Sequence, residues 1–300
     1  MRLSCKVPMI ALASSLTLCL SVVPLVGCSS GNAPADNAAP AEEEVVEETE
    51  AKEEPVAEPV WVKKSETYTY ASSTDDGQNH SYTLAFEIDD AGNTVKETML
   101  ENGEESSYYY NNDEYGWTLT VREENESEAD MPKVTTEHDE TGRVIHFTSD
   151  VSDRTFVYDA EGNCIQIEYH NTAYQYDEEG NRIEGSEHQT RTVANYDANG
   201  FITSRISDWG QPQLSEMTYE YGDDGRPTSC VVTVFALDAD GNKQDEGHAS
   251  EHITFTYDEN GNVTRIESTS DFGITTTEYE YTLIEHPSVA ATVESHLVSF

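Results

Sequence analysis

One six-residue pattern recurs along this chain and constrains its fold more than any other feature. In its fullest form it is Tyr-Asp, two polar residues, Gly and Asn, as at Tyr158–Asn163 and Tyr257–Asn262. Weaker copies keep the glycine, and several successive glycines are 18 or 20 residues apart. A fixed period of this size is the signature of a repeat architecture. The repeat glycines are Gly92, Gly142, Gly162, Gly180, Gly200, Gly225, Gly241 and Gly261.

The chemistry of one unit predicts a turn that follows a strand. The Asp side chain can accept hydrogen bonds from the amides just beyond it, and the two middle residues suit a type I turn. The glycine can then adopt the positive φ of a bulged hairpin connection. Before the turns the residues alternate, so that Phe156 and Tyr158 share a face, as do Phe255 and Tyr257. This period of two predicts strands with one buried face and one wetted face.

A period near twenty has room for two strands and two turns, so each unit is expected to form one hairpin beside the next. We therefore predict an all-β fold, an elongated antiparallel meander of stacked hairpins in an open, twisted sheet. Asn102-Gly103 predicts one further two-residue hairpin. Near the C-terminus, Ser288 can cap a short helix, and either this helix or a final strand would close the open edge of the sheet. The apolar face of the helix would carry Val289, Val293 and Leu297.

The units resemble the YD repeat of Rhs-type and teneurin-type proteins. The match is clearest at Tyr158–Asn163, Tyr176–Asn181 and Tyr257–Asn262, and it extends over roughly residues 136–285. Apolar residues two and five positions after the glycine, such as Val263 and Ile266, add to the likeness. The resemblance implies long antiparallel β-ribbons, which in that family often curl into a shell around a cargo. Because the units here are few and several are degenerate, we expect an open sheet.

The start of the chain is typical of a bacterial secretion signal. Arg2 and Lys6 precede an apolar run over residues 9–25, and Leu25-Val26-Gly27-Cys28 follows. This tetrad resembles the lipobox of bacterial lipoproteins, in which the cysteine is acylated and becomes the first residue of the mature chain. The resemblance implies an extracytoplasmic protein that the lipid on Cys28 anchors to the membrane. The alternative is an ordinary signal peptide with a coincidental cysteine.

The chain is thus divided into a signal peptide (1–27), an acidic linker (28–60) and a repeat-containing β domain (61–300). Residues 29–60 have no aromatic side chain and are dominated by Glu, Ala and Pro. Such a stretch cannot bury enough apolar surface to offset its chain entropy, so we expect a disordered tether that its charge keeps extended.

The charge of the chain restricts its partners. It carries 59 acidic residues against 16 basic ones, for a net charge of −43. This surface would repel nucleic acid, which we exclude as a partner. The acidity serves solubility, or it attracts a basic or cation-rich partner.

Metal and redox sites are weakly indicated. Asp238–Asn242 resembles part of an EF-hand loop, but the first and twelfth positions would be Ala and Gly, so we keep only weak surface calcium binding. Cys164 and Cys230 remain as thiols after signal removal; they either form a disulfide or fill apolar sites. Asp271-Phe272-Gly273 matches a kinase tripeptide without its companion motifs, so we expect a hairpin turn with a buried Phe272.

No catalytic motif is present: the sequence has neither His-Glu-x-x-His nor Gly-x-Ser-x-Gly, and it implies no cofactor. Trp209, in a predicted loop, either stacks on a sugar or folds back on the sheet. We therefore expect a non-catalytic module that binds carbohydrate, a cell-surface protein or cell-wall material. The alternatives are a hydrolase, which should have a deep cleft, and a passive spacer, which should have no ligand-sized concavity.

The lipid anchor gives a first prediction. Cys28→Ala removes the thiol to which the lipid would be attached, so this variant should move from the membrane fraction to the soluble fraction. Immunoblotting of fractionated cells measures the shift. A variant that still sediments with membranes after a high-salt wash would contradict the anchor.

Overall fold

The strands and the helix have these bounds: β1 (Val60–Ser72), β2 (His80–Ile88), β3 (Thr94–Glu101), β4 (Glu104–Asn112), β5 (Thr118–Glu123), β6 (Thr135–His138), β7 (Val144–Thr148), β8 (Ser152–Tyr158), β9 (Cys164–Ala173), β10 (His188–Tyr196), β11 (Ile202–Asp208), β12 (Pro212–Tyr221), β13 (Pro227–Ala236), β14 (His248–Tyr257), β15 (Val263–Ser270), β16 (Gly273–Ile284) and α1 (Val289–His296). The computed structural model describes residues 58–73, 79–123, 134–149, 152–173, 183, 185–208 and 211–298.

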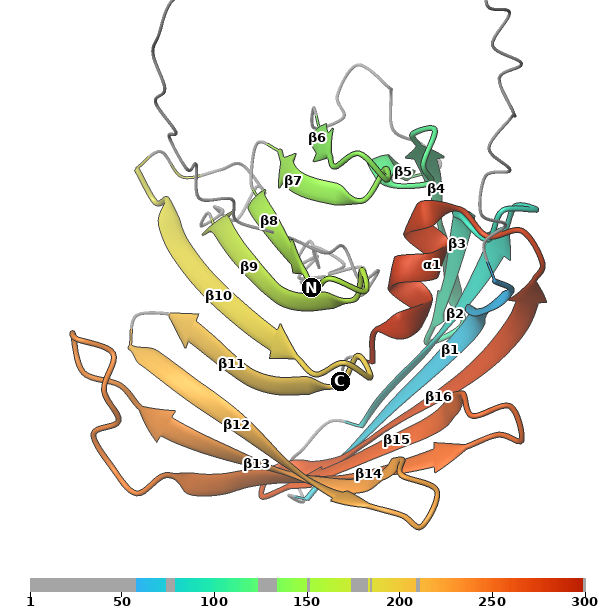
Figure 1. Cartoon of the computed structure of the whole chain (residues 1–300). Helices are drawn as coiled ribbons and strands as arrows, with labels where there is room; N and C mark the ends of the chain where they lie inside the picture. The colour runs from blue at the N-terminus through green and yellow to red at the C-terminus, as the bar shows by residue number, and fades with distance from the viewer. Residues whose placement is uncertain are drawn as a thin grey trace, which may run out of the picture.

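All of these strands belong to one antiparallel sheet. Its order is β5-β4-β3-β2-β1-β16-β15 and then on down to β6, so every pair of adjacent strands is consecutive in sequence except β1 with β16. The all-β fold and the meander of hairpins are confirmed. The sheet is also strongly curled: β1–β4 lie on one side of α1 and β7–β10 on the other (Figure 1). The two edge strands, β5 and β6, are not paired with each other.

The repeat turns have the geometry that their residues favour. Asp159 Oδ1 accepts the backbone N–H of Asn163 at 2.8 Å, and the Asn163 side-chain amide donates to Oδ2 at 3.0 Å. Asp258 and Asn262 repeat both bonds, each at 2.9 Å. This carboxylate–amide exchange explains why Asn follows the glycine. Seven of the eight repeat glycines have φ between +78° and +96°, and Gly180 lies outside the described residues.

The tyrosine of the repeat ties each hairpin to its neighbour in the sheet. The hydroxyl of Tyr158 donates to the carbonyl oxygen of Val144 at 3.2 Å, and that of Tyr257 donates to Pro227 at 2.7 Å. Tyr281, near the end of β16, donates to Val263 at 2.8 Å. Each acceptor lies two residues after a turn glycine. The repeat therefore encodes a turn and also a bond to the adjoining strand.

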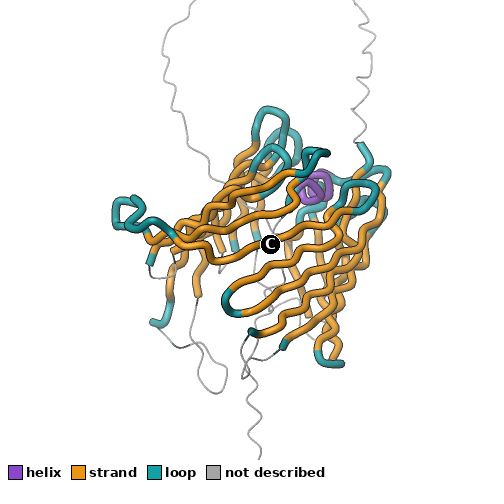
Figure 2. Tube along the Cα trace, turned by 90° about the horizontal axis from the view of Figure 1, so that it is seen from below, coloured by secondary structure: helices purple, strands orange, loops and turns teal. Residues whose placement is uncertain are grey.

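The C-terminal helix is present and is capped as predicted, because the Ser288 hydroxyl accepts the N–H of Ala291 at 3.0 Å. Its position differs from our expectation, since it does not cover an edge of the sheet. The helix lies inside the curl (Figure 2). There Ala290, Val293 and Leu297 join the main hydrophobic core. A strand edge offers only backbone groups, whereas the concave face offers apolar side chains, and burial of the helix's own apolar residues decides the outcome.

Contacts near the helix bring the two ends of the curl together. The Trp117 indole N–H, from the β4–β5 turn, donates to the carbonyl oxygen of Gly142 at 3.0 Å. Nearby, His138 Nε2 lies 2.9 Å from Asp113 Oδ2. A Cβ atom on Gly142 would lie 2.2 Å from the Tyr115 ring, so only glycine permits this approach. The two edges are thus joined by side chains where no β-ladder connects them.

Other sequence predictions can also be compared with the structure. Phe272 does occupy a hairpin turn, but the prediction that it is buried is wrong: it is 76% exposed. It sits at the tip between β15 and β16, where no second layer covers it. Cys164 and Cys230 are buried free thiols. Strand β1 begins at Val60, and nearly all of the predicted linker lies outside the described residues.

The helix in the described part of the chain has eight residues, and no described helix is long and apolar enough to span a membrane.

The turn geometry predicts the effect of Gly162→Val. Gly162 has φ +96°, where a β-branched residue adds strain of roughly 1 kcal/mol or more. A loss of that size should lower the melting temperature by about 2–4 °C. Ala160→Ser changes the same turn without changing its dihedral requirement and should melt like the parent. Circular dichroism measures both, and an unchanged melting temperature for the valine variant would refute the turn assignment.

Candidate functional site

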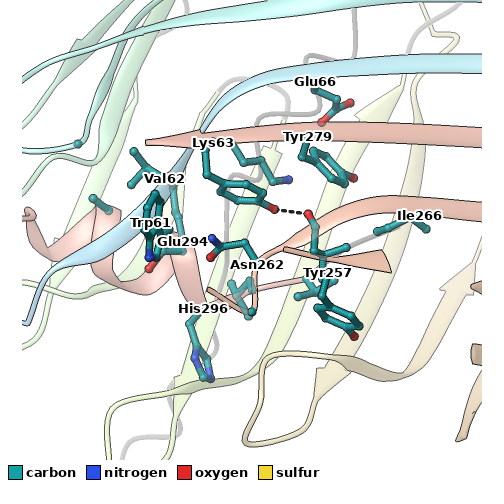
Figure 3. Close-up of a pocket in the computed structure, with 18 of the residues that line it drawn as sticks. Trp61, Val62, Lys63, Glu66, Tyr257, Asn262, Ile266, Tyr279, Glu294 and His296 are labelled. Atoms are coloured by element: carbon teal, nitrogen blue, oxygen red, sulfur yellow. Dashed lines mark hydrogen bonds between the residues drawn. The ribbon is translucent and has the colours of Figure 1, made fainter. Parts of the chain in front are cut away.

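A cavity of about 330 Å³ lies between α1, the segment that follows it and the concave face of the sheet (Figure 3). This volume is at the small end of the range for small-molecule sites, about 300–1,000 Å³. Aromatic rings and ionisable groups line it together. The main ones are Trp61, Lys63, Glu66, Tyr279, Tyr281 and Glu294.

A β-bulge in β1 places two of these ionisable groups on the cavity face. Lys63 pairs with Tyr281 and Glu66 pairs with Tyr279, while the register shifts between Lys63 and Ser65. Residues directly opposite in a sheet share a face, so Lys63 and Glu66 lie beside the two tyrosines. The extra residue, Lys64, points outward: its side chain is 61% exposed and its Nζ lies 3.8 Å from Glu280.

Lys63 has no anionic partner in direct contact. Its Nζ lies 4.4 Å from the centroid of the Tyr279 ring, a cation–π contact. It forms no ion pair or hydrogen bond within the described part of the chain. Burial lowers the pKa of the Lys63 ammonium, and the more distant charges of Glu66 and Glu294 partly oppose that shift.

The two carboxyl groups of the cavity are equally unpaired. Glu66 is only 7% exposed, and Glu294 exposes its side chain toward the cavity. Neither makes a hydrogen bond or ion pair with another described residue. Burial raises the pKa of Glu66, and burial also raises the pKa of Glu294 to about 7, although Lys63 opposes both shifts.

Several other polar groups around the cavity already have partners, among them Arg226, whose guanidinium lies 3.7 Å from the Asp224 carboxylate. The hydroxyls of Tyr257 and Tyr281 donate to backbone carbonyls, and the Asn262 amide is bonded to Asp258. His296 Nε2 lies 3.0 Å from the carbonyl oxygen of Ala198. Lys63, Glu66 and Glu294 are therefore the groups left to bind a ligand. An unpaired buried polar group costs about 1–3 kcal/mol, and such groups in native proteins call for an explanation.

The candidate residues from the sequence lie in different parts of the molecule, and some lie outside the described residues. Cys28, Gly180 and Trp209 lie outside the described residues. Gly92 and Gly261 line the cavity wall. Asp238 uses one carboxylate oxygen to accept the N–H groups of Asp240 and Asn242, at 2.9 and 2.8 Å. In the described ranges no three His, Cys, Asp or Glu side chains are grouped to hold a metal ion.

Sequence reasoning missed Lys63, Glu66 and Glu294. Lys63 and Glu66 are three residues apart, so strict alternation would place them on opposite faces of β1. The bulge that brings both to the cavity face leaves no clear sequence signal. Glu294 follows Val293 on the helix and resembles a solvent-facing residue until the sheet curls around it. The turn at Asp113–Trp117 was also missed, because Asn112 stands where the repeat has tyrosine.

Comparisons with known proteins give little further guidance. No protein-family model matches the chain, and no curated protein sequence matches it. One similar solved structure is a porin-like protein from Bacteroides uniformis ATCC 8492, with 11% identity, a TM-score of 0.31, and coverage of 73% of this chain and 98% of that one. Another, titled TcdB2-TccC3-Cdc42, has 13% identity, a TM-score of 0.23, and coverage of 72% and 15%. Likenesses this weak say nothing about function.

The raised pKa of Glu294 predicts a pH-dependent stability. The folded chain holds this proton up to about pH 7, whereas an unfolded carboxyl releases it near its ordinary pKa of 4.5. The folded state thus binds more protons in this window, and its stability falls as the pH rises through it. Glu294→Gln cannot ionise, so its melting temperature should exceed that of the parent at about pH 8, with no gain at about pH 4; because the side chain is exposed, solvent screens the effect and the gain is small.

Differential scanning calorimetry at both pH values measures this difference. Glu285→Gln, an exposed residue just before the helix, is the matched control and should show no such pH dependence. An equal gain for Glu294→Gln at both pH values would show that its carboxyl is not desolvated.

Proposed function

We propose that this chain is a membrane-anchored extracytoplasmic lipoprotein, built from YD-like repeats, that binds a small molecule without catalysis. The observation that carries the proposal is a ligand-sized cavity lined by Lys63, Glu66 and Glu294, whose ionisable groups make no hydrogen bond or ion pair with a described residue. The anchor part of the proposal rests on the tetrad that ends at Cys28. Residues 28–60 would then hold the β domain away from the membrane surface.

The cavity favours a binding role over a passive spacer, because a spacer needs no ligand-sized concavity. It is also more enclosed than the long, shallow surface that we expected of a repeat module. The repeats form its wall and contribute Arg226, while β1 and α1, which lie outside the repeats, provide Lys63, Glu66 and Glu294.

A hydrolase is the second candidate, since Glu66 and Glu294 lie in one cavity and carboxyl pairs perform general acid–base catalysis. Such chemistry requires environments that set the two groups apart, with one carboxyl protonated and the other ionised. Here burial raises the pKa of both carboxyls. Because the pKa values of both carboxyls shift in the same direction, the pair supports ligand binding better than it supports general acid–base catalysis.

The bulge supplies a matched pair of variants to test binding in the cavity. The full-length protein in detergent is dialysed against a mixture of amino acids, dipeptides, monosaccharides and disaccharides, and mass spectrometry identifies any compound that it retains. Parent and Lys64→Met should retain the same compound, and Lys63→Met should lose most of it, because only Lys63 faces the cavity.

Melting curves show whether both variants are folded before dialysis. Two results would contradict the proposed function: retention of no compound by the parent, or equal retention by Lys63→Met.

A further inference from the structure

The charges that line the cavity restrict the class of its ligand more closely than its volume does. This step rests on the proposed function and asks which class of molecule the cavity takes. Arg226 also lines the wall, but its guanidinium already lies 3.7 Å from the Asp224 carboxylate. The remaining charged groups are one ammonium, on Lys63, and two carboxyl groups, on Glu66 and Glu294. These groups lie on β1 and α1, which approach the cavity from different sides. None has a hydrogen bond or ion pair within the described ranges, so each is available to a bound molecule.

Ligands of a single charge type leave part of this set unpaired. A simple anion would pair with Lys63 and leave two carboxyl groups facing it. A simple cation would pair with Glu66 or Glu294 and lie near the Lys63 ammonium. An uncharged sugar offers hydrogen bonds but no countercharge, and groups held away from bulk water gain most from a charged partner.

We infer that the cavity binds a small zwitterion with both an ammonium and a carboxylate, of the class of a free amino acid or short peptide. Its carboxylate pairs with Lys63, and its ammonium pairs with Glu294, with Glu66 as the second carboxyl group. The ring of Tyr279, which already lies 4.4 Å from a lysine ammonium, provides a face that attracts positive charge. Val263 and Ile266 provide apolar wall for the remainder of the ligand.

The electrostatic field of the whole chain favours the same class of ligand. A net charge of −43 repels molecules that carry only negative charge and draws in molecules with a cationic end. Lys63 then supplies the local positive charge that a carboxylate needs within an otherwise acidic protein. The volume of about 330 Å³ restricts the ligand to one of small size.

Matched derivatives of one ligand test the two pairings separately. Isothermal titration calorimetry of the full-length protein uses a panel of L-amino acids and dipeptides, their N-acetyl forms and their C-terminal amides, with neutral monosaccharides and disaccharides beside them. At least one zwitterion should bind, and each blocked form of it should bind at least about tenfold more weakly, the loss expected for one charged hydrogen bond.

Variants then assign each pairing to its residue. Lys63→Met should bind the zwitterion and its amide equally while still rejecting the N-acetyl form. Glu294→Gln should reject the amide but no longer discriminate against the N-acetyl form. Lys64→Met should keep both preferences. Because each readout is a ratio within one variant, a general loss of folded protein cannot imitate it.

The outcomes separate this inference from the proposed function. A saccharide that binds only when Lys63 is present would overturn the zwitterion and leave the binding function standing. A zwitterion whose discrimination is unchanged in both cavity variants would place its site elsewhere and overturn both. If no member of the panel binds, the zwitterion inference fails, and the binding function then rests on the dialysis result.

Discussion

The pairing of β1 with β16 is the interaction on which the rest of the molecule depends. It joins strands from the two ends of the β domain, with Tyr68 opposite Thr277 in the middle of a long register. In every other pair of adjacent strands, the two strands are consecutive in the sequence. The pairing of β1 with β16 joins strands β1–β5 and strands β6–β16 into one sheet. It also directs the chain that leaves β16 into α1, inside the curl.

Local chemistry explains which parts of the fold the sequence could predict. The repeat turns require only residues within a few positions of each other, as the bonds between Asp159 and Asn163 show. Asn102 and Gly103, with φ of +51° and +84°, form the tight hairpin that their types favour. Ser288 caps its helix for the same reason. In each case one short segment carries both the residues and the geometry that they adopt.

The curl and the cavity depend on distant residues, so the repeat pattern could not reveal them. Closing β1 onto β16 has the entropy loss of a long loop, and only the packed sheet compensates for it. The bulge at Lys64 is defined by its register against β16, and it reverses the alternation on which the sequence prediction relied. Strict alternation would place Lys63 and Glu66 on opposite faces, so the candidate site was found only in the structure.

The repeats stabilise the sheet, whereas the site holds the unpaired ionisable groups. Unpaired buried polar groups lower stability by about 1–3 kcal/mol each, a substantial share of the roughly 5–15 kcal/mol that stabilises a typical domain. Of the three cavity groups only Glu66 is buried, while Lys63 is half-buried and Glu294 is exposed. The wall around them is tied repeatedly, through turn carboxylates and through hydroxyls such as that of Tyr281. The site lies where this wall meets β1 and α1, the elements that carry no repeat. A regular scaffold can thus hold an unpaired set of charges, and a ligand that pairs them would stabilise the fold as it binds.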